Sequence, residues 1–453
     1  MSDFSTMTIQ ELLSHKANVC ECGRDHASSL QYVKIAPGAI CCLPDTLAAL
    51  SVKRPFVVCD RNTYKAAGEK AISLLKEAGI DYRLFVYEST PRKMEPDEMA
   101  VGSLTMAFDT ACDGIIAVGS GVINDCCKVL ANKVKLPLSV VATAPSMDGY
   151  ASSSSSMIRN HIKVSLYVEC PHAILCDIDI MKDAPMEMLM AGLGDMLAKY
   201  IAICEWRISN LVTGEYYCEN IANLMRSSVN KCWNMADRLM TRDPAAVAAV
   251  TEGLVLSGIA MSFANISRPA SGLEHYFSHL WEMMALARGE ECHLHGIQVG
   301  VGSVITLHLM DELRKVLPGR EQAEKAMSAF SQEVWEEEMR AIFGAIAPAV
   351  IADEKTTLIN DPLRHAQRLE KILANWPEIL RMMEEELPAT GEILSKMKAL
   401  NMPHAPIDLG IDLDETRKAF IGSRVIRDKY LTSTLIWDLG LTQQFADLLK
   451  VAY

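Results

Sequence analysis

Residues 113–128, which read DGIIAVGSGVINDCCK, decide the fold of this chain. The run begins with uninterrupted apolar residues, as is typical of a parallel strand covered on both faces. A turn with glycines at 119 and 121 follows, and a helix is predicted from about 123 to 135. The glycines would let a ligand approach the backbone, and the N–H groups at the helix start favour a pyrophosphate.

Two phosphate-binding patterns are excluded for this segment. It is not the GxGxxG fingerprint, because Asn124 stands where the third glycine belongs. The lysine of a nucleoside triphosphate loop is absent from its place as well. A strand-to-helix turn with two glycines is often only a tight turn, so the segment by itself leaves both interpretations open.

Strands alternate with helices on both sides of this segment. The predicted strands cover residues 55–59, 82–87, 114–118, 138–142 and 173–176. Helices are expected at about 63–79, 95–112 and 123–135. This alternation predicts a parallel sheet with crossover helices. Between the last two strands, residues 152–168 indicate a loop and a hairpin that turns near Asn160.

Beyond Asp183 and Pro185, which suit a helix start, the pattern is helical to the C-terminus. Amphipathic stretches cover residues 186–208, 213–239, 245–263, 272–286 and 297–316. We therefore expect an α/β domain at residues 1–184 and an all-helical domain at 185–453.

Composition narrows the class of protein. The 453 residues are 50% hydrophobic and 22% charged, which is typical of a soluble globular chain. The net charge is −13, since 44 basic residues face 57 acidic ones, and this disfavours nucleic-acid binding. The 14 cysteines are too few for a disulfide scaffold. No signal peptide or membrane span is expected, so we predict a cytoplasmic protein.

Polar residues gather where predicted strands end. Asp60 ends the first strand and could accept the hydroxyls of an adenine ribose, or simply cap the next helix. Thr143, Ser146, Asp148 and Ser152 follow the strand at 138–142. Ligands of open parallel sheets bind at this edge, although a polar loop alone would look the same.

The helical half offers metal ligands. Asp195 follows Gly194 in an apolar helix, where an unpaired charge is costly. His275 and His279 are four residues apart on one helical face, and His295 precedes another helix. Each histidine alone is more often a core or capping residue. Together with Asp195 they form a nitrogen and oxygen set for zinc, nickel or iron(II) with open positions.

A second group, Cys20, Cys22 and His26, also looks like a cluster of metal ligands. It lacks a clear fourth ligand in the sequence, so a turn with incidental thiols is the favoured interpretation.

These motifs occur in an order that resembles a known family. From the glycine turn to His295-Gly, over roughly residues 20–300, the chain is similar to the sn-glycerol-1-phosphate dehydrogenases. That family lies within the superfamily of iron-containing alcohol dehydrogenases, glycerol dehydrogenases and dehydroquinate synthases. The early CxCG and residues 426–431 resemble its bacterial branch.

The resemblance implies a Rossmann-like NAD(P) domain, a helical metal domain and an active site in the cleft between them. It assigns the dinucleotide to Asp60, Gly119, Ser120, Gly121, Val122, Ile123, Asn124, Asp125, Thr143, Ala144, Pro145, Ser146 and Ser152. It assigns one divalent metal to Asp195, His275 and His295, and substrate contacts to Asp148, Asp195 and His279.

The chemistry implied is the interconversion of dihydroxyacetone phosphate and sn-glycerol 1-phosphate, in a homodimer or larger homo-oligomer. The metal would polarise the ketone, and His279 would relay a proton. Arg159, Lys163 and Arg268 are candidates for the substrate phosphate. A dehydrogenase of glycerol or another non-phosphorylated alcohol is one alternative. A dehydroquinate synthase-like cyclase is another, although Asp195 after Gly194 argues against it.

Overall fold

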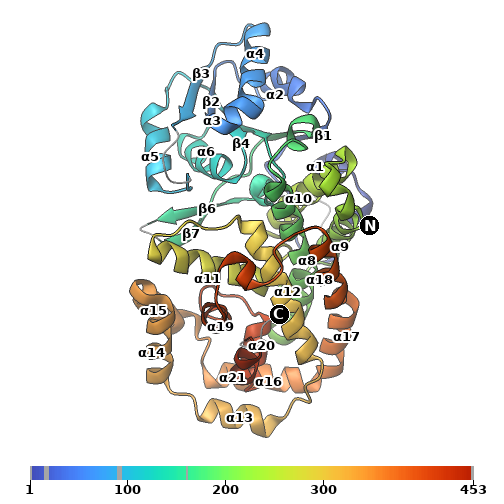
Figure 1. Ribbon diagram of the computed structural model, residues 1–453, viewed down its shortest axis with the longest axis vertical. Coiled ribbons are helices and arrows are strands. Elements are labelled where there is room, and N and C mark those ends of the chain that lie inside the picture. Colours follow the sequence, from blue (N-terminus) through green and yellow to red (C-terminus); the bar gives the residue numbers. More distant parts are fainter. Residues whose placement is uncertain (1–2, 15–19, 89–93, 160–161, 450–453) are drawn as a thin grey trace. The chain divides into compact units, whose positions relative to one another are not determined.

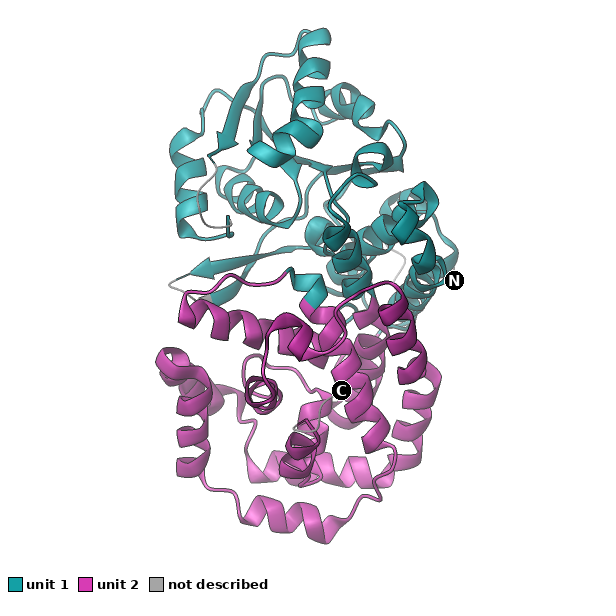
Figure 2. Cartoon of the chain, viewed as in Figure 1, with its two compact units in different colours: residues 1–196, 218–270, 294–297 teal, residues 197–217, 271–293, 298–453 magenta. Residues whose placement is uncertain are grey.

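The computed structural model describes residues 3–14, 20–88, 94–159 and 162–449. The chain forms two compact units (Figure 2). Unit 1 contains residues 1–196, 218–270 and 294–297, and unit 2 contains residues 197–217, 271–293 and 298–453. Each unit combines separate stretches of the chain. The domain boundary expected near residue 184 therefore stays a prediction.

Unit 1 is built on a six-stranded sheet in the order β1-β8-β5-β4-β2-β3. Figure 1 labels β1, β2, β3 and β4 of this sheet. Its strands are β1 (Tyr32–Ala36), β2 (Pro55–Asp60), β3 (Arg83–Tyr87), β4 (Gly114–Gly119), β5 (Leu138–Ala142) and β8 (Ala173–Asp177). Every pairing in it is parallel. The predicted parallel sheet is therefore confirmed, with the strands from β2 onward where the sequence placed them.

Strand β1 was not predicted. It pairs only with β8, so it is an edge strand, and its lysine, Lys34, is exposed. An edge strand does not need the uninterrupted apolar run that marks a central strand such as β4. Its signal is correspondingly weak in the sequence.

Several helices of unit 1 pack apolar residues against the sheet. Alternate residues of β2 and β4, together with Val141 of β5 and Leu175 of β8, join one buried cluster with η2, α2 and α4. The helices of the unit are η1 (Phe4–Thr6), α1 (Ile9–Ser14), η2 (Ala39–Cys42), α2 (Leu43–Ala49), α3 (Arg61–Thr63), the π-turn η3 (Tyr64–Gly68), α4 (Glu69–Glu77), α5 (Glu98–Ala107), α6 (Gly121–Val134), η4 (Gly149–Ala151), α7 (Ile178–Met181), α9 (Glu219–Met235), η5 (Ala236–Thr241) and α10 (Pro244–Ala264).

Two strands form a separate hairpin in unit 1. Strands β6 (Ser154–Arg159) and β7 (Ile162–Tyr167) pair antiparallel, with Ser154 opposite Tyr167. The predicted hairpin is confirmed, while its expected turn near Asn160 lies outside the described residues.

Helix α10 is long and apolar enough to cross a membrane by composition alone. However, 78% of its apolar window is buried inside the protein. Burial of this extent is usual for a core helix of a globular protein.

Unit 2 is helical. Helices α8 (Met186–Thr213) and α12 (His295–Leu313) begin in unit 1 and continue into unit 2. The remaining helices are α11 (Leu273–Arg288), α13 (Arg320–Ser328), α14 (Gln332–Phe343), η6 (Gly344–Ile346), α15 (Ala347–Thr357), α16 (Pro362–Ala374), α17 (Trp376–Glu386), α18 (Thr390–Ala399), η7 (Pro406–Leu409), α19 (Leu413–Gly422), α20 (Thr432–Asp438) and α21 (Thr442–Leu448). Residues 178–449 are all described and contain no strand, as expected from the sequence.

Candidate active site

The glycine turn joins the end of β4 to the start of α6 in unit 1. A Cβ at Gly119 would lie 2.7 Å from the side chain of Ile123, so the turn itself requires glycine there. A Cβ at Gly121 would meet only Met147, at an ordinary 3.5 Å. The fold therefore has no packing reason for the second glycine, and the predicted ligand role remains its best explanation.

The turns after β4 and β5 are hydrogen-bonded to each other. The strands end side by side, with Gly119 opposite Ala142. Ser120 Oγ lies 2.6 Å from Ser146 Oγ, and the hydroxyl of Tyr150 lies 3.0 Å from Ser120 Oγ. The structure thus brings together Ser120 and Ser146, two of the residues predicted to bind the dinucleotide.

Lys128 is a buried lysine that the sequence reasoning did not assign. Its Nζ donates to the carbonyl of Gly149 at 2.9 Å and lies 3.3 Å from Ser152 Oγ. The same amine pairs with Asp125 Oδ1 at 3.2 Å. Lys128 therefore holds the loop that contains Ser152. In the sequence, the i,i+3 spacing of Asp125 and Lys128 indicates their ion pair.

Asp195 connects α8 to the loop that follows β5, within unit 1. The side chain is fully buried, and Oδ2 accepts a 2.9 Å hydrogen bond from the backbone N–H of Asp148. Ser257 donates to Asp148 Oδ2 at 2.7 Å. The two carboxylates predicted to meet substrate therefore lie on adjoining segments.

Two glycines permit the close packing around this point. A Cβ at Gly192 would lie 1.9 Å from the carbonyl oxygen of Pro145. One at Gly296 would lie 1.9 Å from that of Ala191. The start of α12, which carries His295, therefore packs against α8 at Ala191. Ala191 lies one helical turn before Asp195.

His275 lies in the first turns of α11 in unit 2. Its Nδ1 is 2.9 Å from Oε1 of the buried Glu274. A carboxylate can only accept, so Nδ1 carries the proton and the lone pair is on Nε2. This arrangement is usual for metal-binding histidines. The sequence reasoning did not single out Glu274, although it directly precedes His275.

His279 lies one turn further along α11. Its Nδ1 is 3.7 Å from Oε2 of Glu282, a second carboxylate on the same helix. Glu282 is buried, as is His279, so the carboxylate and the imidazole lie together inside unit 2. Only the i,i+3 spacing of the two residues could have indicated this pair from the sequence.

The N-terminus of α11 is fixed by residues distant in the sequence. Glu205 Oε2 accepts from the backbone N–H of Leu273 at 3.0 Å, and Oε1 accepts from that of Thr432 at 2.8 Å. Lys429 donates to the carbonyl of Ser271 at 3.0 Å. The segment at 426–431 therefore supports the helix that carries the two histidines.

Asp60 caps a helix. Its Oδ1 accepts from the backbone N–H of Thr63 at 2.8 Å, and Thr63 Oγ1 accepts from the N–H of Asp60 at 3.0 Å. This reciprocal pair is a capping box. The structure thus shows the capping role, while ribose binding stays a prediction.

The candidates for the substrate phosphate differ in burial. Arg159 is exposed at the end of β6, Lys163 is half-buried on β7, and Arg268 is 1% exposed. The remaining histidine of the motif region, His293, is exposed, and its Nε2 lies 3.0 Å from the carbonyl of Leu409. The position of His293 is therefore set by a contact with a backbone carbonyl, and not by a contact with the predicted metal ligands.

Comparisons with known proteins identify the family of this chain. The model of the family of iron-containing alcohol dehydrogenases matches residues 34–185. A glycerol-1-phosphate dehydrogenase (NAD(P)+) of Halalkalibacterium halodurans is 33% identical over 302 residues, which are 66% of this chain and 76% of the relative. This chain belongs to the iron-containing alcohol dehydrogenase family.

A second relative and a solved structure are also similar to this chain. The glycerol-1-phosphate dehydrogenase (NAD(P)+) of Bacillus licheniformis is 30% identical over 77% of this chain and 89% of its own. A probable glycerol dehydrogenase from Sinorhizobium meliloti has the same fold, with a TM-score of 0.59. It covers 92% of this chain and 98% of its own at 16% identity. The predicted fold class is confirmed.

Proposed function

We propose that this chain interconverts dihydroxyacetone phosphate and sn-glycerol 1-phosphate with NAD(P)(H) and one divalent metal. The observation that carries the proposal is the similarity to two glycerol-1-phosphate dehydrogenases at 33% and 30% identity, over 66% and 77% of this chain. Membership of the alcohol dehydrogenase family supports the reaction class, and the relatives support the substrate.

We propose Asp195, His275 and His295 as the residues that would hold the divalent metal. Asp195 is a buried carboxylate, and the proton on Nδ1 of His275 leaves Nε2 for a ligand bond. Two imidazoles and one carboxylate are a set that suits zinc, nickel or iron(II). When bound, such an ion supplies a Lewis acid that polarises a carbonyl and stabilises the charge that develops on its oxygen.

The turn after β4 fits a dinucleotide. Ser120 is the N-cap of α6, and its side chain makes no capping hydrogen bond. The N–H groups of the first turn of a helix can bind a phosphate. Asn124 Oδ1 is a buried acceptor for which the described residues offer no donor. A bound NAD(P)H supplies the hydride, and Gly119–Asp125 with Thr143–Ser146 and Ser152 would orient it.

His279 would supply the proton. Reduction of a ketone places negative charge on the carbonyl oxygen, and a positioned imidazolium can neutralise it. Glu282, 3.7 Å from Nδ1, would stabilise that imidazolium before the transfer. Asp148, fixed by Ser257, would accept a hydrogen bond from a substrate hydroxyl. We also propose that the protein is a cytoplasmic homo-oligomer, as the resemblance to its family implies.

The enantiomers of glycerol phosphate test the proposal. Purified, metal-loaded protein would be supplied with sn-glycerol 1-phosphate, sn-glycerol 3-phosphate or glycerol, each with NAD+ and with NADP+. We expect oxidation of the first substrate and little of the other two. Preferred oxidation of glycerol would favour the alternative of a polyol dehydrogenase and contradict the proposed substrate.

A further inference from the structure

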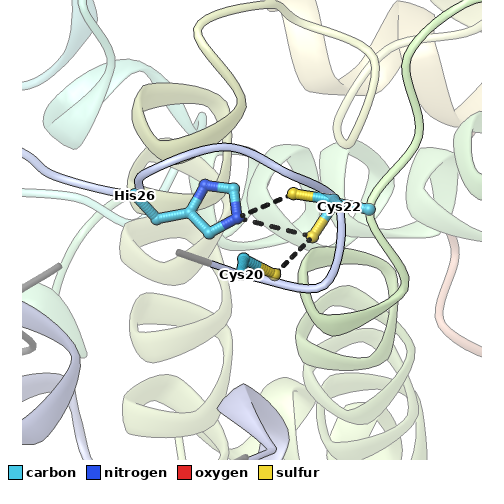
Figure 3. Close-up of side chains that lie close together, drawn as sticks. Cys20, Cys22 and His26 are labelled. Atoms are coloured by element: carbon cyan, nitrogen blue, oxygen red, sulfur yellow. Dashed lines mark hydrogen bonds between the residues drawn. The ribbon is translucent and has the colours of Figure 1, made fainter. Parts of the chain in front are cut away.

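Four metal-ligating side chains meet in unit 1, and none belongs to the proposed catalytic set. Cys20, Cys22 and His26 precede β1 and point toward one another (Figure 3). The fourth, Cys218, is the N-cap residue of α9, almost two hundred positions later in the chain. One ligand atom of each of the four residues lies within 4.8 Å of every other.

The separations between these atoms match the edges of a zinc tetrahedron. Sγ of Cys20 lies 3.7 Å from Sγ of Cys218, and Nε2 of His26 lies 3.4 Å from Cys22 Sγ and 3.5 Å from Cys218 Sγ. Tetrahedral zinc with its usual bond lengths gives about 3.8 Å between two sulfurs and about 3.6 Å between sulfur and nitrogen. The donors are therefore spaced for one ion.

His26 is oriented for coordination. Its Nδ1 lies 3.0 Å from the carbonyl oxygen of Phe263, which can only accept a hydrogen bond. The proton is therefore on Nδ1, and the lone pair of Nε2 faces the sulfurs. The ring is 3% exposed and is packed between Phe4 and Phe263. These contacts hold the imidazole in one orientation, with Nε2 toward the sulfurs.

The backbone around Cys20 suits a thiolate. Residues 20–24 form a tight turn in which Gly23 has a φ of +78°, and the N–H of Gly23 donates to the carbonyl of Cys20 at 2.8 Å. Nδ2 of Asn220 lies 3.5 Å from Cys20 Sγ.

We propose that Cys20, Cys22, His26 and Cys218 bind a structural zinc ion. Three thiolates and one imidazole complete the four-coordinate shell that zinc adopts in structural sites, so no position is left for a substrate. Binding releases the three thiol protons to solvent and leaves a net charge of −1. Asn220 and the positive end of α9 at Cys218 lie where they offset that charge.

The ion would attach the start of the chain to the helices of unit 1. Cys218 begins α9, and the carbonyl that holds His26 belongs to Phe263 near the end of α10. The three other ligands lie in the seven-residue segment 20–26, ahead of β1. Because these segments are so far apart in the chain, a zinc crosslink would restrict the unfolded state and stabilise the folded one.

X-ray absorption at the zinc edge of the wild-type protein tests the site without any mutation. We expect sulfur neighbours at about 2.3 Å, because Asp195, His275 and His295 contain no sulfur. Zinc with only nitrogen and oxygen neighbours would overturn the proposal. A disulfide between Cys20 and Cys218, found by mass spectrometry of the purified protein, would overturn it as well.

Metal analysis of two variants gives the second test. Cys218→Ser should lower the zinc content by one ion per chain and lower the melting temperature. Cys232→Ser is the matched control, since Cys232 is also buried on α9 but contacts the carbonyl of Ala249. It should keep the full zinc content. Equal zinc in both variants and the wild type would contradict the assignment, whatever the enzymatic activity.

Discussion

The backbone N–H of Asp148 donates a 2.9 Å hydrogen bond to the carboxylate of Asp195. The bond links the loop after β5 to α8, and it is made by the oxygen Oδ2 of a fully buried side chain. A carboxylate with two oxygens can accept this bond and still offer a ligand atom. The position of Asp148 therefore depends on the same side chain that we propose as a metal ligand.

Replacement of Gly192 tests the packing behind this contact. Gly192→Ala would place a Cβ 1.9 Å from the carbonyl oxygen of Pro145, so the loop must move away from α8. We expect a loss of about 1–3 kcal/mol in the free energy of unfolding, measured in urea, and a sharp fall in activity. Gly102→Ala is the control, since nothing lies within 4 Å of its Cβ. It should gain about 0.5–1 kcal/mol and keep its activity.

Removal of His275 or His295 tests the ligand set. Each alanine variant should lose one metal ion per chain and most of its activity, because a site of three protein ligands cannot easily lose one. The sheet should remain folded, as judged by circular dichroism. Full metal content in either variant, by elemental analysis, would mean that the ligands have been misassigned.

His279→Ala separates proton transfer from metal binding. The variant should keep its metal but lose about 100- to 10,000-fold in kcat, which is the usual contribution of a general acid. His293→Ala is the matched control, because His293 is exposed and contacts only the carbonyl of Leu409 among the bonds described. It should behave as the wild type. Loss of metal in His279→Ala would instead identify His279 as a ligand.

Asp60→Ser tests the choice of nicotinamide cofactor. If Asp60 faces the adenine ribose, a 2′-phosphate would meet like charge, at a cost of about 1–3 kcal/mol or about 5- to 150-fold in affinity. Serine keeps the cap on α3 but removes the charge. We expect the wild type to prefer NADH over NADPH. In the variant this preference should be smaller, chiefly because the KM for NADPH falls. If the ratio of activity with NADH to activity with NADPH is unchanged in the variant, Asp60 is only a helix cap.

The sequence predicted those parts of the fold that local pattern determines. The apolar runs of β2, β4 and β5 and the long helices of unit 2 appear where their periodicity placed them. The edge strand β1 was missed, because half-burial leaves no continuous apolar run. The predicted helix at 63–79 is interrupted by a π-turn at Tyr64–Gly68, which apolar spacing does not reveal.

The site residues that were missed act through tertiary contacts. Glu274 and Glu282 matter because they lie against His275 and His279, and the sequence shows only their spacing. Cys218 is the clearest case: Cys20 and Cys22 appeared to lack a fourth ligand, and the fold supplies it from the start of α9. No local pattern contains a contact between residues so far apart.

Comparison of dihydroxyacetone phosphate with dihydroxyacetone tests the central claim most directly. Initial rates with NADH and NADPH on metal-loaded wild-type protein give kcat/KM for each substrate. We predict a preference of at least about 100-fold for the phosphorylated ketone, since a buried ionic contact with a phosphate is worth about 3 kcal/mol or more. Equal kcat/KM for the two ketones would contradict a glycerol-1-phosphate dehydrogenase and favour a dehydrogenase of non-phosphorylated alcohols.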